Sequence, residues 1–126
     1  MVGRSLTPSE IDGYDHVDGD LLASVRILRV PFLSPGTSGM ALGGLVMLTD
    51  DSDRSGRSPL MAHELVHVKQ FAERGRTSFL LDYLRHYFRG LMKFRNHREA
   101  YLAIPAEVEA RNATKAWAEQ RPDRRR

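Results

Sequence analysis

Two short apolar segments in the first half of the chain have the pattern of β-strands. Within residues 24–32, apolar positions alternate with arginines until Pro31 interrupts the segment, as in a half-buried strand. Residues 40–49 form a second apolar segment, in which Gly43-Gly44 marks a bulge or a close approach of another backbone. We expect the two segments to pair as a short antiparallel hairpin or sheet.

The second half of the chain predicts three helices. Ser58 and Pro59 are residue types of a helix cap and a first helical position, and Gly75 ends the helix that follows. Residues 77–91 carry apolar side chains at helical spacing. A last helix is predicted over residues 105–117, because it begins with proline and no breaker follows.

A capping box, Thr7-Pro8-Ser9-Glu10, predicts a short helix near the start of the chain, and Gly13 limits its length. The predicted order is one helix, a hairpin and three helices, which is an α+β fold. A chain of 126 residues suits one domain, which we place at residues 1–120. Residues 121–126 are too charged to pack and are expected to form a disordered basic tail.

The helix predicted to begin at Pro59 carries His63-Glu64-Leu65-Val66-His67, which matches the motif H-E-x-x-H. Residues four apart share one face of a helix, so both imidazoles can reach one ion. Glu64 can accept a proton from a water on that ion without binding the metal itself. Chance placement gives about 0.01 such motifs in a chain of this composition, so we predict a zinc site.

A catalytic zinc usually takes three protein ligands and leaves one position open, so a third ligand is needed. The chain has no cysteine, which leaves His, Asp and Glu. The metzincin pattern is excluded, because Gln70 and Glu73 stand where it has glycine and histidine. His86 and His97 lie among arginines, and His16 lies in an acidic segment, so all three are weaker candidates.

Two glutamates of the last predicted helix are better candidates. A start at Pro105 puts Glu107 in the first turn, where small residues such as Ala110 let the helix approach the histidines. Glu107 and Glu109 differ by about 200° around the helix, so only one of them can face the histidines. Glu109 shares its face with alanines too, so packing alone leaves both open, with Glu73 or a histidine as the remaining options.

HELVHVKQ at residues 63–70, followed by YLAIPAEVEA at residues 101–110, resembles the gluzincin pattern, in which a glutamate on a second helix is the third zinc ligand. In several such families, thermolysin-like peptidases among them, that glutamate stands three residues before a small residue. Carried over, the resemblance implies Glu107 as the ligand and Ala110 as the small residue. Glu107 would then complete a set of three zinc ligands with His63 and His67.

A second resemblance covers residues 36–113. The segment GMALGGLVML and the sequence MAHELVHVKQ are similar to the peptidase-like domain of extracellular contractile injection-system proteins. The two resemblances together imply a minimal zincin-like domain, with the hairpin packed on the motif helix and two further helices.

Three further polar residues near the motif or the last helix bear on how the site works. Families with a supporting Asp four residues after the ligand glutamate would need it where this chain has Arg111, so the histidines need another outer partner. Gln70 continues the histidine face, where it either orients a ligand or lies at the surface. We assign to Tyr101, rather than Tyr83, a hydrogen bond to the developing oxyanion. The alternative is a half-buried tyrosine with its hydroxyl at the surface.

The net charge of +3 is modest, and its basic residues gather in residues 74–98 and 121–126. A solvated surface and a tail explain this distribution, so we expect no nucleic-acid partner. No segment reaches the ~18 apolar residues of a membrane span. The first residues lack the apolar region of a secretory signal, so we expect a cytoplasmic protein, with export by another route left open.

These observations predict a zinc-dependent hydrolase of the metallopeptidase type, in which Glu64 takes a proton from water and passes it to the leaving amine. A peptide or protein substrate is expected to pair with the edge strand at residues 40–49. The alternative is a catalytically silent zinc-binding module that serves in assembly or as an effector domain, because a fold and a motif do not guarantee turnover. The sequence does not predict an oligomeric state.

Overall fold

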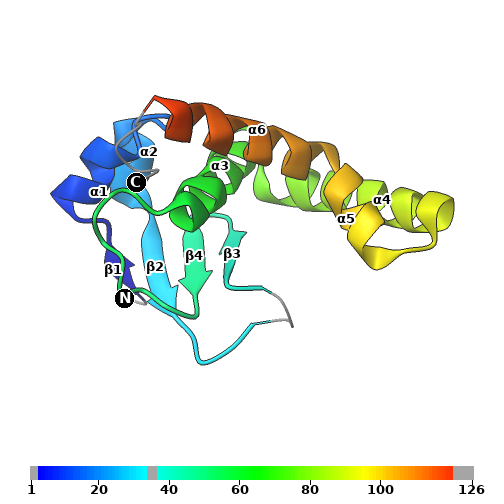
Figure 1. The fold of residues 1–126 in the computed structure, drawn as a ribbon, viewed down its shortest axis with the longest axis horizontal. Helices are drawn as coiled ribbons and strands as arrows, with labels where there is room; N and C mark the ends of the chain where they lie inside the picture. Colours follow the sequence, from blue (N-terminus) through cyan, green and yellow to red (C-terminus); the bar gives the residue numbers. More distant parts are fainter. Residues whose placement is uncertain (1–2, 34–36, 121–126) are drawn as a thin grey trace.

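The protein has an α+β fold in the computed structural model, which describes residues 3–33 and 37–120. These residues form six helices and four strands, which associate in one sheet (Figure 1). The predicted fold class is confirmed, whereas the tail predicted at residues 121–126 lies outside the described residues. The strands are β1 (Arg4–Ser5), β2 (Arg26–Arg29), β3 (Gly39–Leu42) and β4 (Leu45–Leu48), and the helices are α1 (Pro8–Gly13), α2 (Gly19–Ser24), α3 (Pro59–Arg74), α4 (Arg76–Phe94), α5 (His97–Ala103) and α6 (Pro105–Glu119).

The sheet has the strand order β1-β2-β4-β3 and is mixed. β3 and β4 form an antiparallel hairpin, and β1 pairs antiparallel with β2. β2 pairs in parallel with β4, with Ile27 opposite Val46. The predicted antiparallel pairing of residues 24–32 with residues 40–49 is therefore wrong.

Residues 40–49 belong to two strands because Gly43-Gly44 reverses the chain, where we expected a bulge or a close backbone. Gly43 has a φ of 62°, in the left-handed region that glycine adopts without a Cβ penalty. A two-residue turn with such a residue joins antiparallel strands. β3 is therefore the edge of the sheet, and β4 lies between β2 and β3.

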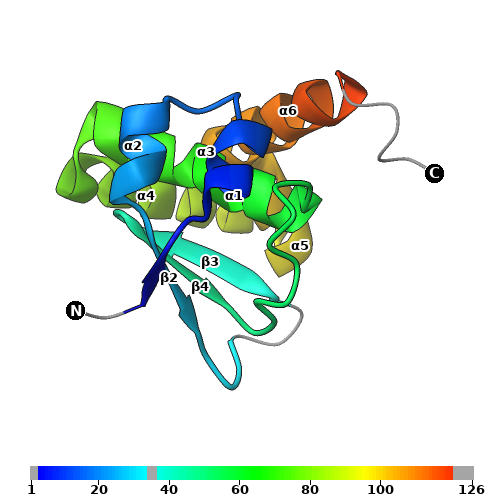
Figure 2. The ribbon, with the colours of Figure 1, turned by 90° about the vertical axis from the view of Figure 1, so that its left-hand side faces the viewer.

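Helix α3 is the central element of the fold. It contacts β3 and β4 on one side and α4 and α6 on the other, and Figures 1 and 2 show it between the sheet and α6. Met61, Leu65 and Val68 are buried in a core that also contains Val46 and Trp117. The helix is thus held in place along its whole length.

The N-terminal segment fixes the two helices that carry the candidate site. The backbone N–H of Ser58, at the start of α3, donates to the hydroxyl of Tyr14 at 3.0 Å. The indole N–H of Trp117, near the end of α6, donates to the carbonyl oxygen of Gly13 at 2.8 Å. Both bonds join segments distant in sequence, so residues 13 and 14 connect the start of α3 with the end of α6, two helices that also pack directly on each other.

Three elements were not predicted: β1, α2 and α5. Of these, α5 bears on the site, because it carries Tyr101. It packs on α4 where Ala100 meets Gly90, and a Cβ at Gly90 would lie 3.1 Å from the Cα of Ala100. Within the described ranges, no helix combines the length and apolarity that crossing a bilayer requires.

Candidate metal centre

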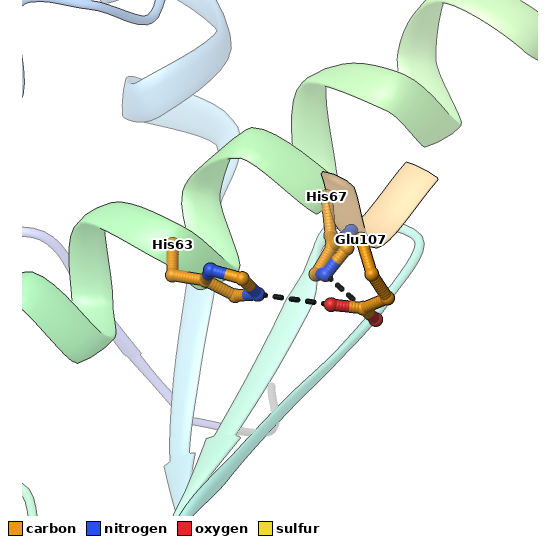
Figure 3. Close-up of side chains that lie close together, drawn as sticks. All are labelled: His63, His67 and Glu107. Atoms are coloured by element: carbon orange, nitrogen blue, oxygen red, sulfur yellow. Dashed lines mark hydrogen bonds and ion pairs between the residues drawn. The ribbon is translucent and has the colours of Figure 1, made fainter. Parts of the chain in front are cut away.

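Helix α3 presents the two histidines of the motif on one face. Ser58 caps the helix by accepting from the backbone N–H of Met61 at 3.2 Å, and Pro59 is the first helical residue. This start fixes the turn that contains His63 and His67. Their Nε2 atoms point toward the same carboxylate (Figure 3).

That carboxylate belongs to Glu107, in the first turn of α6. Its Oε1 lies 3.1 Å from Nε2 of His63, and its Oε2 lies 3.1 Å from Nε2 of His67 (Figure 3). The helices approach closely because Ala106 and Ala110 are buried and small. The structure therefore brings together the three residues predicted as metal ligands.

The donor set fits a zinc ion. One ligand atom from each of His63, His67 and Glu107 lies within 4.8 Å of the others. Ligand atoms ~2.0–2.1 Å from a tetrahedral zinc lie about 3.3 Å from one another. Each imidazole nitrogen lies 3.1 Å from one of the two carboxylate oxygens, close to that spacing, and two imidazoles with one carboxylate are a usual catalytic zinc set.

The charge state of the site also suits a cation. Burial alone would raise the pKa of Glu107, but hydrogen bonds from His63, His67 and Tyr83 hold it far below its ordinary value. Burial lowers the pKa of His67, yet the Glu107 carboxylate outweighs this effect and the net shift is upward. Glu107 thus keeps its negative charge in a mostly buried position, where that charge attracts either a proton on His67 or a metal cation.

Glu64 lies beside this cluster without belonging to it. It lines a pocket together with His67 and Glu107, and only 6% of its surface is exposed. Burial raises the pKa of its carboxyl group above the ordinary value. A carboxylate that binds its proton more readily, close to the cluster, is suited to accept a proton there.

The pocket is bounded on one side by the edge strand β3 and on another by α4. Met40 and Leu42 come from β3, and Phe79 and Leu80 come from α4. Its walls are thus largely apolar, and its polar groups gather at the cluster. Such a pocket, with few converging polar groups, is typical of a ligand site.

Two tyrosines reach the pocket, and they relate differently to Glu107. The hydroxyl of Tyr83 donates to Oε2 of Glu107 at 2.6 Å. Tyr101 lines the same pocket from α5 and is 38% exposed. Burial and the charge of Glu107 raise both tyrosine pKa values, so both hydroxyls keep their protons at neutral pH and can donate.

Gln70 is the outer partner of His67, and of the two alternatives that the sequence left open its contacts agree with a residue that orients a ligand. Its side-chain oxygen lies 2.8 Å from Nδ1 of His67, and its nitrogen lies 3.0 Å from the carbonyl oxygen of Ala106. Its nitrogen also donates to the carboxylate of Glu109. Gln70 is 1% exposed, so its interpretation as a surface residue is wrong.

The other ligand candidates lie elsewhere. Glu109 contacts Gln70 rather than the histidines, and the ring of His97 bonds to Tyr87 at 2.8 Å. Nε2 of His16 lies 3.0 Å from the carbonyl oxygen of Ala62. Across the described parts of the chain, His63, His67 and Glu107 are the one group of three such side chains close enough to share an ion.

Arg111 occupies the position where some gluzincin families have a supporting aspartate. Its guanidinium donates to the carbonyl oxygen of Leu102 at 2.6 Å. It therefore ties α6 to α5 and does not orient a histidine.

Comparisons with models of known families, with curated proteins and with solved structures found no match to this chain.

Proposed function

We propose that the protein is a zinc-dependent hydrolase of the metallopeptidase type, with a zincin-like fold of the gluzincin kind. The observation that carries the proposal is the convergence of His63, His67 and Glu107, with Glu64 in the pocket that His67 and Glu107 also line. The sequence resemblance to gluzincins supports the same ligand set. A bound zinc would polarise the carbonyl of an amide bond and make water a better nucleophile at neutral pH.

Glu64 supplies the proton transfers. As a carboxylate it takes a proton from the attacking water, and as the acid it returns that proton to the leaving amine. Its buried position and raised pKa favour both steps, because a pKa closer to the working pH improves a general acid–base group. Tyr101 keeps its proton and lines the pocket, so it is placed to donate to the developing oxyanion.

The substrate is a peptide or protein segment in extended form, paired with the free edge of β3. Met40 pairs with Met47, and Leu42 pairs with Leu45 next to the two-residue turn. In an antiparallel ladder, hydrogen-bonded pairs alternate with pairs whose backbone groups point outward. The N–H and C=O of Ala41 therefore face the free edge, beside the pocket, where another strand can add.

Cleavage of a mixed peptide library by the zinc-loaded protein tests the proposal. Glu64→Gln is expected to keep its zinc and to lose about 10²–10⁴-fold in cleavage rate, since Glu64 transfers protons without binding the metal. Glu73→Gln is the matched control, because Glu73 is an exposed glutamate on the same helix.

Full activity in Glu64→Gln would end the peptidase proposal. Zinc binding by the wild type without cleavage of any peptide would favour the alternative, a catalytically silent zinc-binding module. Loss of zinc in Glu64→Gln would mean that Glu64 has a structural role.

A further inference from the structure

We propose that Gln70 is a positioning residue that holds His67 with its proton on Nδ1 and its Nε2 lone pair free for the metal. The inference rests on the proposed zinc site and adds a residue that the H-E-x-x-H motif does not contain. It follows from the partners at the two ends of one buried amide.

The orientation of the Gln70 amide is determined by its neighbours on α6. One end lies 3.0 Å from the carbonyl oxygen of Ala106 and in contact with the carboxylate of Glu109. Both groups only accept hydrogen bonds, so this end must be the NH₂ group, which has two protons to donate. The opposite orientation would place an oxygen against two oxygens.

The same orientation determines which nitrogen of His67 carries the proton. The amide oxygen of Gln70 lies 2.8 Å from Nδ1 of His67, and an amide oxygen can only accept. Nδ1 must therefore donate its proton, which leaves the lone pair of the neutral ring on Nε2. Nε2 is the atom that faces Glu107, so a bound metal would take the place of the proton that Nε2 otherwise donates to that carboxylate.

Gln70 also connects the two halves of the site. It lies on α3, one turn after His67, while both partners of its NH₂ group lie on α6 on either side of Glu107. With 1% of its surface exposed, its hydrogen bonds do not compete with water. One amide thus fixes the ring of one ligand and the spacing of α3 from the helix that carries another.

Zinc affinity, measured by competition with a chelator, is the first test. Gln70→Met keeps the length of the side chain and removes its hydrogen bonds, and we expect it to bind zinc about 10- to 100-fold more weakly. Gln120→Met is the matched control, because Gln120 is exposed at the end of α6, and wild-type affinity is expected. Circular dichroism on each variant shows whether the fold is retained.

Nuclear magnetic resonance gives a readout that a general loss of packing would not produce. In the zinc-loaded wild type, we expect a proton on Nδ1 of His67 that exchanges slowly with water. In Gln70→Met this proton should exchange fast. Glu109→Ala is the second variant, since it removes one of the two acceptors that orient the amide and leaves Gln70 in place. It should weaken zinc binding a few-fold, about the effect of one hydrogen bond.

Zinc affinity and Nδ1 proton exchange equal to the wild type, in a folded Gln70→Met or in Glu109→Ala, would overturn this inference and leave the zinc site intact. Absence of zinc binding by the wild type would overturn the proposed function and this inference with it.

Discussion

The hydroxyl of Tyr83, on α4, lies 2.6 Å from Oε2 of Glu107, on α6, and donates a hydrogen bond to it. The same oxygen lies 3.1 Å from Nε2 of His67. Tyr83 therefore orients a ligand carboxylate from outside the proposed metal site. Tyr101 lines the pocket from α5, on the side where a substrate would lie.

The two tyrosines should give opposite results when each is changed to phenylalanine. Tyr83→Phe removes a hydrogen bond to a charged group, so zinc affinity should fall about tenfold. Tyr101→Phe should bind zinc like the wild type and lower kcat by about 10²–10³-fold, because it removes an oxyanion donor. Chelator competition and steady-state kinetics measure the two effects. Wild-type zinc affinity in Tyr83→Phe would contradict the role of Tyr83 in orienting Glu107. A wild-type kcat in Tyr101→Phe would contradict the role of Tyr101 as an oxyanion donor.

The free edge of β3 gives a separate prediction about substrate binding. Ala41→Pro removes an N–H that points away from β4, so the hairpin should keep its hydrogen bonds while the substrate loses one. We expect a higher KM for extended peptides, with zinc content unchanged. Ala41→Ser keeps the N–H and is the control. An unchanged KM in Ala41→Pro would place the substrate elsewhere.

Arg4 forms a partly buried charge cluster with Glu10 and Asp51, none of which belongs to the candidate metal centre, and this cluster predicts a pH dependence of stability. Its guanidinium donates to Glu10 and to Asp51, at distances of 2.7–3.0 Å. The hydrogen bond from Arg4 holds the pKa of Asp51 below the ordinary value, against the opposing effect of burial. The stability that Asp51 contributes is therefore present above the ordinary pKa of an aspartate and is lost as the pH falls through its lowered pKa.

Asp51→Asn should accordingly lower the free energy of unfolding by about 1.5–3 kcal/mol at pH 7. The difference from the wild type should begin to shrink as the pH falls below about 4, where an aspartate of the unfolded chain becomes protonated, and should vanish below the lowered pKa of Asp51 in the folded protein. Urea unfolding at several pH values measures this, with the exposed Asp53→Asn as control. A difference that stays constant down to acidic pH would show that Asp51 acts through packing.

Local signals explain what could be predicted from the sequence. The bounds of α3 follow from Ser58, Pro59 and Gly75, whose effects lie within one turn of each helix end. The four-residue spacing of His63 and His67 is also a local signal, and it determines that both side chains lie on one face of the helix. The sequence also contains a local signal for α5, although we expected no helix there. Asn96 is the N-cap residue of α5 and accepts a hydrogen bond from the backbone N–H of Glu99 at 3.1 Å.

Contacts between distant segments could not be predicted in this way. The parallel pairing of β2 with β4 depends on the path of the whole connection, and Gly43-Gly44 is compatible with a bulge or a turn. The local pattern also does not decide between Glu107 and Glu109 as the third ligand, because the choice depends on how α6 packs on α3. Both glutamates lie next to small residues, and only the packing of α6 on α3 turns Glu107 toward the histidines and Glu109 toward Gln70.

Zinc titration of the wild type, Glu107→Ala and Glu109→Ala tests whether His63, His67 and Glu107 together form a zinc site. The wild type should bind one zinc per chain, and Glu107→Ala should lose most of its affinity, because the site keeps only two ligands. Glu109→Ala should retain its zinc with an affinity only a few-fold weaker, because Glu109 acts through Gln70. The account is contradicted if the wild type binds no zinc, or if Glu109→Ala loses the metal while Glu107→Ala holds it.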